Sequence, residues 1–247
     1  MDNSPSFDHD THKLEEIVTL GSMELGITLP PGAGAAFGKY YTFLTKCSRK
    51  FNLTAIAGAE EVARLHFLDS IALLNATHIS NASVIDIGSG AGFPGLPMKI
   101  VQPSITLTLL DATGKRVRFL SELCDILGLN ATCLCARAEE FSHNPGARQK
   151  YDVAISRAVA RLNILCELCL PFVTTGGIFI AMKCIDSNEE ITQARTAIET
   201  LGAQLQDCFD YTIPGTDIVH RAVVIRKTSK TADKYPRRFA KIQKSPL

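Results

Sequence analysis

The sequence predicts an α/β protein built on a doubly wound, mostly parallel sheet, with an antiparallel hairpin near the C-terminus and a helical N-terminal extension. Two observations predict this class. From about Ala82 onward, apolar runs of strand length alternate with longer segments of helical periodicity. A glycine-rich turn follows the first of these runs, where a sheet of this kind forms its ligand crevice.

Length and composition limit the class further. The chain has 247 residues and is 46% hydrophobic, which is enough for one large core and a smaller extension. Its apolar runs stay below the ~20 residues that span a bilayer, and the polar N-terminus resembles neither a secretory signal nor a transit peptide. We therefore expect a cytoplasmic monomer with no membrane contact and no obligatory protein partner.

Four segments follow from the change in pattern along the chain. Residues 1–12 are polar and are expected to be disordered, and residues 13–80 are expected to form a helical cap. Residues 81–228 carry the alternation of strands and helices, and residues 229–247 form a basic tail.

The elements of the cap follow from apolar residues at three- and four-residue spacing. This spacing predicts helices over 12–25, 34–52 and 58–77, with FNLTAIAG at 51–58 as an irregular linker.

The elements of the sheet domain follow from runs of apolar residues bounded by turn signals. The expected strands are 83–88, 105–113, 131–138, 151–159, 176–183, 204–213 and 220–227. The expected helices are 95–103, 114–130, 162–173 and 187–202. The last two strands flank PGTD, so we expect them to form a hairpin that adds an antiparallel edge to the sheet.

Eight cysteines are scattered along the chain. Cys166 and Cys169 form a C-x-x-C pair, and Cys133 and Cys135 form a C-x-C pair, but these spacings match known zinc patterns poorly. Reduced cysteine packs as a small hydrophobic residue, so we expect no metal site.

The glycine turn, VIDIGSGAGFPG, runs from residue 84 to residue 95. Glycine costs backbone entropy on folding, so a cluster indicates a tight bend or a close approach to a ligand. Residues 90–95 match the dinucleotide pattern G-x-G-x-x-G, whereas residues 86–92 match D-x-G-x-G-x-G, the loop of S-adenosylmethionine-dependent methyltransferases.

Two features favour the methyltransferase alternative, namely Asp86 and the closing hairpin, which is typical of the methyltransferase sheet. Asp86 is a poor neighbour for a diphosphate and a good one for the ammonium group of a methionyl moiety. Asp111 ends the next strand, where an acid binds ribose hydroxyls in either class. The residues therefore favour a class I, Rossmann-like methyltransferase domain, with an NAD-dependent oxidoreductase as the alternative.

Further candidates follow the third and fourth strands. Glu139 is expected to accept a hydrogen bond from the adenine amine or to begin a helix. Arg157 is expected to hold the cofactor carboxylate or an RNA phosphate, or to pair with a carboxylate. His66 and Asp69 are three residues apart on a helix, and we expect them to make structural, capping or RNA contacts rather than to form a catalytic dyad.

Charge is distributed unevenly. The net charge is only +1, but residues 221–247 hold nine Lys or Arg against one acid. Such a tail indicates either RNA phosphate contacts or a solvated segment, so a non-catalytic RNA-binding protein is a third possibility. The side chains expected to contact phosphate are Lys115, Arg116, Arg118, Lys234, Arg237 and Arg238.

Several longer motifs resemble the bacterial small-subunit ribosomal RNA methyltransferase G family, also called glucose-inhibited division protein B, from about Phe37 onward. They are FNLTAI (51–56), HFLDSIALL (66–74), DIGSGAGFPGLP (86–97), LLDATGKRVRFL (109–120), RAEEF (137–141) and ISRAVA (155–160). The KYPRR segment of the tail resembles family members as well.

The resemblance implies methyl transfer from S-adenosylmethionine to N7 of guanine 527 in 16S rRNA, as naked RNA or in the small ribosomal subunit. It places cofactor contacts on Gly88, Phe93, Asp111, Ala112, Thr113, Ala138, Glu139 and Arg157, to which the loop argument adds Asp86 and Gly90. Guanine N7 carries a lone pair and no proton, so no general base is expected. Asn52 and Arg157 are expected to position the guanine.

Overall fold

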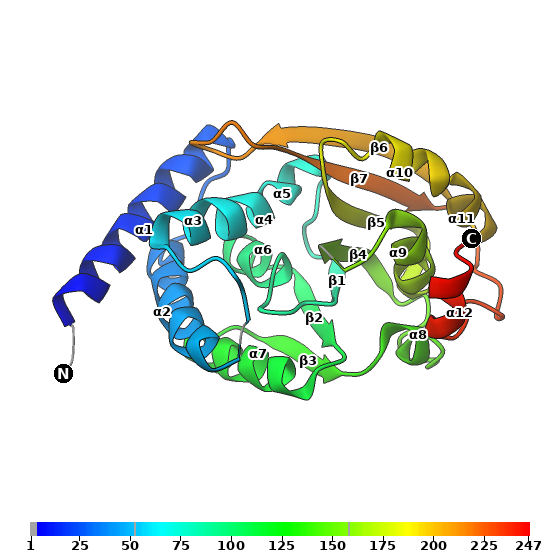
Figure 1. Ribbon diagram of the computed structural model, residues 1–247, viewed down its shortest axis with the longest axis horizontal. Coiled ribbons are helices and arrows are strands. Elements are labelled where there is room, and N and C mark those ends of the chain that lie inside the picture. The colour runs from blue at the N-terminus through cyan, green and yellow to red at the C-terminus, as the bar shows by residue number, and fades with distance from the viewer. Residues whose placement is uncertain (1–3, 52, 158) are drawn as a thin grey trace.

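The computed structural model describes residues 4–51, 53–157 and 159–247. Its centre is a seven-stranded sheet in the order β3-β2-β1-β4-β5-β7-β6 (Figure 1). The strands are β1 (Ser83–Ile87), β2 (Thr106–Asp111), β3 (Ala131–Cys135), β4 (Tyr151–Arg157), β5 (Val173–Cys184), β6 (Ala203–Thr212) and β7 (Val219–Lys227). Strands β1 to β5 are parallel, and β7 is antiparallel to both of its neighbours.

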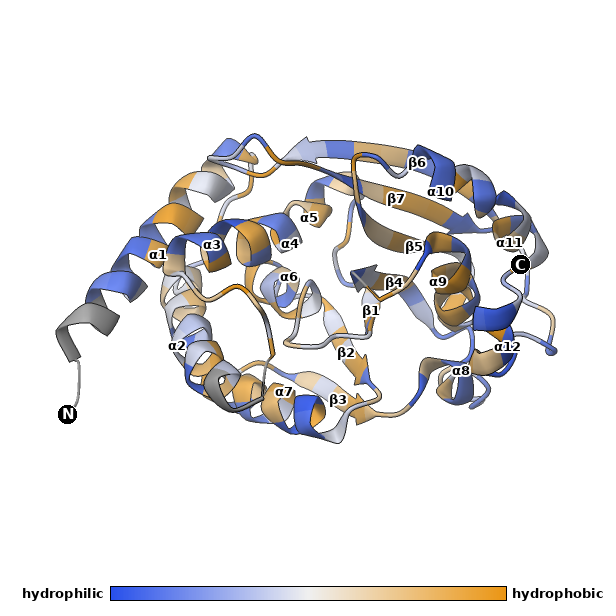
Figure 2. Cartoon of the chain, in the orientation of Figure 1, coloured by the Kyte–Doolittle hydropathy of each residue, from blue (hydrophilic) through white to orange (hydrophobic). Residues whose placement is uncertain are grey.

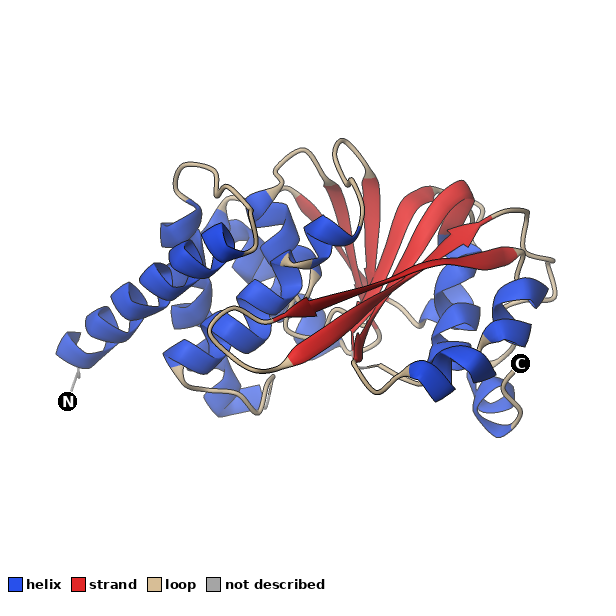
Figure 3. Cartoon of the chain, turned by 90° about the horizontal axis from the view of Figure 1, so that it is seen from above, coloured by secondary structure: helices blue, strands red, loops and turns tan. Residues whose placement is uncertain are grey.

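Helices lie on both faces of the sheet (Figure 3). The N-terminal helical segments are α1 (Ser4–Glu24), α2 (Ala33–Phe51), α3 (Ala59–Val62), a π-helical turn (Ala63–Leu68), α4 (Asp69–Ile71) and α5 (Leu73–Ala76). Those of the sheet domain are α6 (Gly95–Val101), α7 (Gly114–Leu127), α8 (Ala138–Phe141), α9 (Leu162–Cys169), a 3₁₀ turn (Leu170–Phe172), α10 (Asn188–Gln193), α11 (Arg195–Thr200) and α12 (Phe239–Lys244).

Each face of the sheet buries its own apolar cluster. Helices α6 and α7 pack on one face with the N-terminal helices outside them, and α9 packs on the other face with α8, α10, α11 and α12 around it. Successive residues of a strand point to opposite faces, so Val84 belongs to the first cluster and Ile85 to the second. Figure 2 shows that β5 and α9, which pack on each other, are both largely hydrophobic. Cys166 and Cys169 are buried in the second cluster.

The predicted alternation of strands and helices is confirmed, and so is the mostly parallel sheet. The antiparallel hairpin at the edge of the sheet is confirmed as well: β7 pairs with β5, and β6 is the outermost strand. The physical reason is burial: residues 222–225 of β7 are all buried, whereas β6 is mostly exposed and forms the edge. An apolar strand is more stable with neighbours on both sides.

Other differences concern the ends of elements. Helix α1 begins at Ser4, where we expected disorder up to residue 12, and the expected helix over 58–77 is interrupted by the π-helical turn. The basic tail contains helix α12, which local periodicity did not reveal. Within the described residues, no helix is both long and apolar enough to cross a membrane.

Candidate active site

The loop between β1 and α6 is held against the end of β2. The backbone N–H groups of Gly88 and Ser89 donate to the carbonyl oxygen of Leu110, at 2.8 and 3.2 Å. Gly88 has a φ of +74°, and a Cβ there would lie 2.5 Å from Val159. Gly90 has a φ of +58°, and a Cβ there would meet nothing nearer than 3.8 Å. The loop therefore requires glycine and leaves open space in front of its backbone for a ligand.

Asp111, at the end of β2, organises this loop. Its Oδ2 accepts a hydrogen bond from the N–H of Gly90 at 3.0 Å, and its Oδ1 accepts one from Thr113 at 2.8 Å. Arg116 lies 3.5 Å from Oδ2. A carboxylate has about four acceptor sites, so capacity remains for the two hydroxyls of a ribose.

A cavity of about 140 Å³ lies beyond the ends of β1, β2 and β3. Its lining residues are Ile87, Gly88, Leu110, Asp111, Ala112, Ala136, Arg137, Ala138, Glu139, Val159, Leu168 and Phe239. We call it the adenosine cavity, because apolar walls suit a purine and Asp111 suits a ribose. It brings together five of the ten predicted cofactor residues: Gly88, Asp111, Ala112, Ala138 and Glu139.

Asp86 lies beneath the loop and has no exposed surface. Its Oδ2 accepts a hydrogen bond from the N–H of Gly95 at 2.9 Å, and burial raises the pKa of the carboxyl to about 7. Through this hydrogen bond Asp86 fixes the start of α6 and with it the loop. The expected contact between Asp86 and the ammonium group of a cofactor stays a prediction.

A second, larger cavity of about 630 Å³ lies beyond the ends of β4 and β5. Its lining residues are Ile56, Leu65, His66, Asp69, Arg157, Met182, Lys183, Cys184, Asp186, Ser187, Glu190, Ile218 and His220. We call it the substrate-side cavity. Its charged side chains come from distant parts of the chain: Asp69 lies in the cap, Arg157 ends β4 and Glu190 lies on α10.

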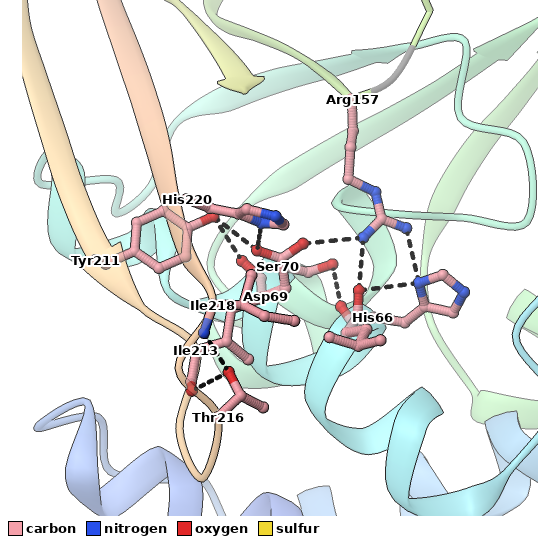
Figure 4. Close-up of polar contacts among 10 residues, drawn as sticks. His66, Asp69, Ser70, Arg157, Tyr211, Ile213, Thr216, Ile218 and His220 are labelled. Carbon is pink, nitrogen blue, oxygen red and sulfur yellow. Dashed lines mark hydrogen bonds and ion pairs between the residues drawn. The ribbon is translucent and has the colours of Figure 1, made fainter. Parts of the chain in front are cut away.

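Arg157 and Asp69 organise the substrate-side cavity (Figure 4). Arg157 donates from Nη1 to the carbonyl oxygen of Leu65 at 3.1 Å and to Oδ2 of Asp69 at 3.3 Å, and from Nη2 to Nδ1 of His66 at 3.1 Å. Arg157 thus lies between His66 and Asp69 and bonds to both. This arrangement supports the structural role expected for the two residues and not a catalytic dyad.

Asp69 is buried and accepts hydrogen bonds from three side chains. The hydroxyl of Tyr211 and Nδ1 of His220 each donate to Oδ1 at 2.8 Å, and Arg157 donates to Oδ2. The hydrogen bond to Asp69 raises the pKa of His220 above its usual value. Asp69 therefore ties the cap to β4, β6 and β7 through a single carboxylate.

Phe93, in the glycine loop, packs against two residues of the substrate-side cavity. Its ring stacks on Tyr40 at 5.3 Å and on His66 at 4.4 Å, and the Arg157 guanidinium lies over it at 5.0 Å. The hydroxyl of Tyr40 donates to the carbonyl oxygen of Ala91 at 2.5 Å. Burial, followed by the charge of Arg157, lowers the pKa of His66 to about 4, so the imidazole is neutral at pH 7.

The remaining predicted residues fall into three groups. Asn52 lies outside the described residues. Five basic residues are exposed: Lys115, Arg116 and Arg118 on α7, and Lys234 and Arg238 before α12. Of these, Arg116 lies beside Asp111. Arg237 differs from these residues, because its Nε and Nη2 donate to the buried carboxylate of Glu167 at 2.8 and 2.6 Å. This ion pair holds the tail to the domain, and the RNA contact expected of Arg237 stays a prediction.

The sheet order, the glycine loop and the acid after β2 together define a class I S-adenosylmethionine-dependent methyltransferase. A solved S-adenosylmethionine-dependent methyltransferase from Aquifex aeolicus has this fold, with a TM-score of 0.50 at 15% identity. The similarity covers 67% of this chain and 92% of that chain. The cofactor is S-adenosylmethionine, which sets aside the NAD-dependent alternative.

The family follows from the sequence comparisons. A family model described as rRNA small subunit methyltransferase G matches residues 34–214. A curated relative of that name from Acetivibrio thermocellus is 42% identical over 236 residues, covering 95% of this chain and 97% of the relative. Another, from Clostridium botulinum strain Loch Maree, is 46% identical over 213 residues, covering 85% and 89%. The chain belongs to the rRNA small subunit methyltransferase G family.

Proposed function

We propose that this enzyme methylates N7 of guanine 527 in 16S rRNA and that the guanine enters the substrate-side cavity. The observation that carries the proposal is the position of this cavity, beyond the ends of β4 and β5 and joined to the glycine loop through Phe93. Relatives of the chain are named for small-subunit rRNA, which supports the substrate class. We propose a cytoplasmic monomer as the acting form.

S-adenosylmethionine, when bound, supplies an electrophilic methyl group. Gly88, Asp111, Ala112, Ala138 and Glu139 would hold its adenosine part, since they line the adenosine cavity. The chain itself need not remove a proton, because guanine N7 presents a lone pair in the ring plane. His66 is consistent with a reaction without a general base, since both nitrogens of its neutral ring form hydrogen bonds, one with Thr54 and one with Arg157. The work of the chain is therefore to position the base.

Arg157 is the residue best placed to position the base. Within the described residues, three of its five N–H donors have partners, which leaves donors for a substrate oxygen. Guanine O6 is an acceptor beside N7, so a hydrogen bond to O6 orients the base and leaves the N7 lone pair free. The contacts to Asp69 and His66 hold the guanidinium plane in a fixed orientation for this task.

The RNA must present the guanine outside its stack, because a base within a helix does not enter a cavity. Lys115 and Arg118 on α7, together with Lys234 and Arg238, offer exposed charges for the flanking phosphates. Each phosphate contact that is removed should weaken RNA binding and lower its salt dependence by about one unit of slope.

The test supplies labelled S-adenosylmethionine with either naked 16S rRNA or small subunits that lack the modification. We expect labelled 7-methylguanosine at a single position, mapped by borohydride and aniline cleavage of the RNA. Asp111→Ala is the inactive control, which should still bind RNA. Label on a different atom or base, or no label from a protein that binds S-adenosylhomocysteine, would contradict the proposal.

A further inference from the structure

The adenosine cavity has one aromatic wall that comes from the far C-terminus. Phe239, the first residue of α12, lines the cavity, whereas its other lining residues lie between Ile87 and Leu168. Figure 1 shows α12 beside α8 and α9, far along the chain from the glycine loop. The family match ends at residue 214, so it assigns nothing to this helix.

Helix α12 is fixed in place by its apolar side. Ile242 is fully buried and belongs to the same apolar cluster as Leu168, which also lines the adenosine cavity. Phe239 packs against this cluster as well. The ring therefore contributes to the cavity as part of a packed element.

The chain before α12 is anchored by polar contacts. The guanidinium of Arg148 donates to the carbonyl oxygens of Thr231 and Tyr235, each at 3.0 Å. Two residues later, the backbone N–H and the guanidinium of Arg237 bond to Glu167, which has no exposed surface. A buried carboxylate is stable only with such partners, so the ion pair holds the start of α12 firmly.

The surroundings of the ring suit an adenine. The guanidinium of Arg137 lies 5.3 Å from the centre of the Phe239 ring, and its Nε donates to Oε1 of Glu139 at 2.6 Å. Arg137, Glu139 and Phe239 all line the cavity. An aromatic face pairs well with the flat face of a purine, and a carboxylate accepts from the exocyclic amine.

We propose that Phe239 stacks on the adenine ring of the cofactor, so that the first residue of α12 forms part of the cofactor site. The inference rests on S-adenosylmethionine as cofactor and is independent of which RNA base is methylated. It assigns an adenine-binding role to a region that sequence composition alone marks only as basic.

The chain contains no tryptophan, which provides a direct test. In F239W, S-adenosylhomocysteine should quench or shift the fluorescence of the single indole, with saturation at the affinity that calorimetry gives. K241W places the same fluorophore on an exposed position of the same helix and should not respond. F239A should weaken S-adenosylhomocysteine binding by roughly 10- to 100-fold, because stacking on one base contributes in this range, whereas K241A should bind as the wild type does.

The wild-type protein offers a measurement that needs no substitution. Bound S-adenosylhomocysteine should slow amide hydrogen exchange in residues 237–244. Unchanged affinity in a folded F239A variant, or unchanged exchange of α12 in the saturated wild type, overturns the proposal. Both readouts use only cofactor binding, so their failure is distinct from a failure to methylate guanine 527.

Discussion

The two cavities at this edge of the sheet are built in different ways. The adenosine cavity is small, about 140 Å³, and is lined mainly by glycine, alanine and apolar residues directly after β1, β2 and β3. The substrate-side cavity is about 630 Å³ and is lined by charged residues from the cap, β4, β5 and the β6–β7 hairpin. The cofactor side thus depends mainly on local strand-to-loop geometry, with Phe239 as a wall from a distant segment, whereas the substrate side depends throughout on contacts between distant segments.

Asp69 illustrates the dependence on distant segments. Its three side-chain donors, Arg157, Tyr211 and His220, lie 88, 142 and 151 positions away along the chain. A substitution in this network should change the placement of several groups at once. Asp111 bonds instead to the nearby N–H groups of Gly90 and Thr113. A substitution in the adenosine cavity should therefore change mainly the affinity for the cofactor.

The largest effect should come from Asp111→Ala. The substitution removes the proposed ribose acceptor and two hydrogen bonds that hold Gly90 and Thr113. Charge-assisted hydrogen bonds contribute about 1.5–3 kcal/mol each, so the Kd for S-adenosylhomocysteine should rise by at least about 100-fold. Calorimetry checks this, with the exposed Glu122→Ala as control. An unchanged Kd would show that Asp111 is not the cofactor residue.

Arg157→Lys should lower kcat much more than it changes the affinity for the cofactor. A lysine cannot bond at once to Leu65, Asp69 and His66, so the base should be poorly oriented, and kcat should fall by about 100-fold. The Kd for S-adenosylhomocysteine should change by less than about threefold. Initial rates and calorimetry measure the two quantities. An equal loss in both would place Arg157 in the cofactor site and remove the contrast.

His66 should produce a smaller effect on stability, with a definite sign. Its pKa falls from the usual 6.5 to about 4 on folding, so below pH 6.5 the unfolded chain binds a proton that the folded protein does not. The free energy of unfolding should therefore decrease by about 1.5 kcal/mol between pH 6.5 and pH 5. Urea titrations at the two pH values test this. A folded His66→Gln variant should lose less stability over that interval; an equal loss would exclude His66 as its source.

His220 should give the smallest effect, with the opposite sign. Asp69 raises its pKa in the folded protein, so its stabilisation is complete below pH 6.5 and is lost as the pH rises through the raised value. The stability difference between the wild type and His220→Gln should accordingly be larger at pH 6 than at pH 9. The same titrations measure it. A difference that grows with pH would show that the His220–Asp69 contact is not a charged pair.

Much of the fold could be predicted because its signals are local. Strands β1 to β5 are apolar runs of strand length. Gly90 lies in the loop after β1 and Asp111 is the last residue of β2, so both could be placed once these runs were recognised. Helix α12 was not predicted, because it is short and has one buried residue, Ile242, which packs on the α9 side of the sheet. A single apolar residue gives no helical periodicity. The basic composition of the tail concealed that Arg237 pairs with a buried acid.

The sequence by itself determined the sheet, the glycine loop and the acid that ends β2. Each of these is encoded in a few consecutive residues, whose conformation follows from glycine freedom and alternating burial. Only the tertiary structure decided that Asp86 supports the loop from below, that Arg157 joins His66 to Asp69, and that Phe239 lines the adenosine cavity. These contacts depend on where distant segments meet, and packing around a shared core decides that.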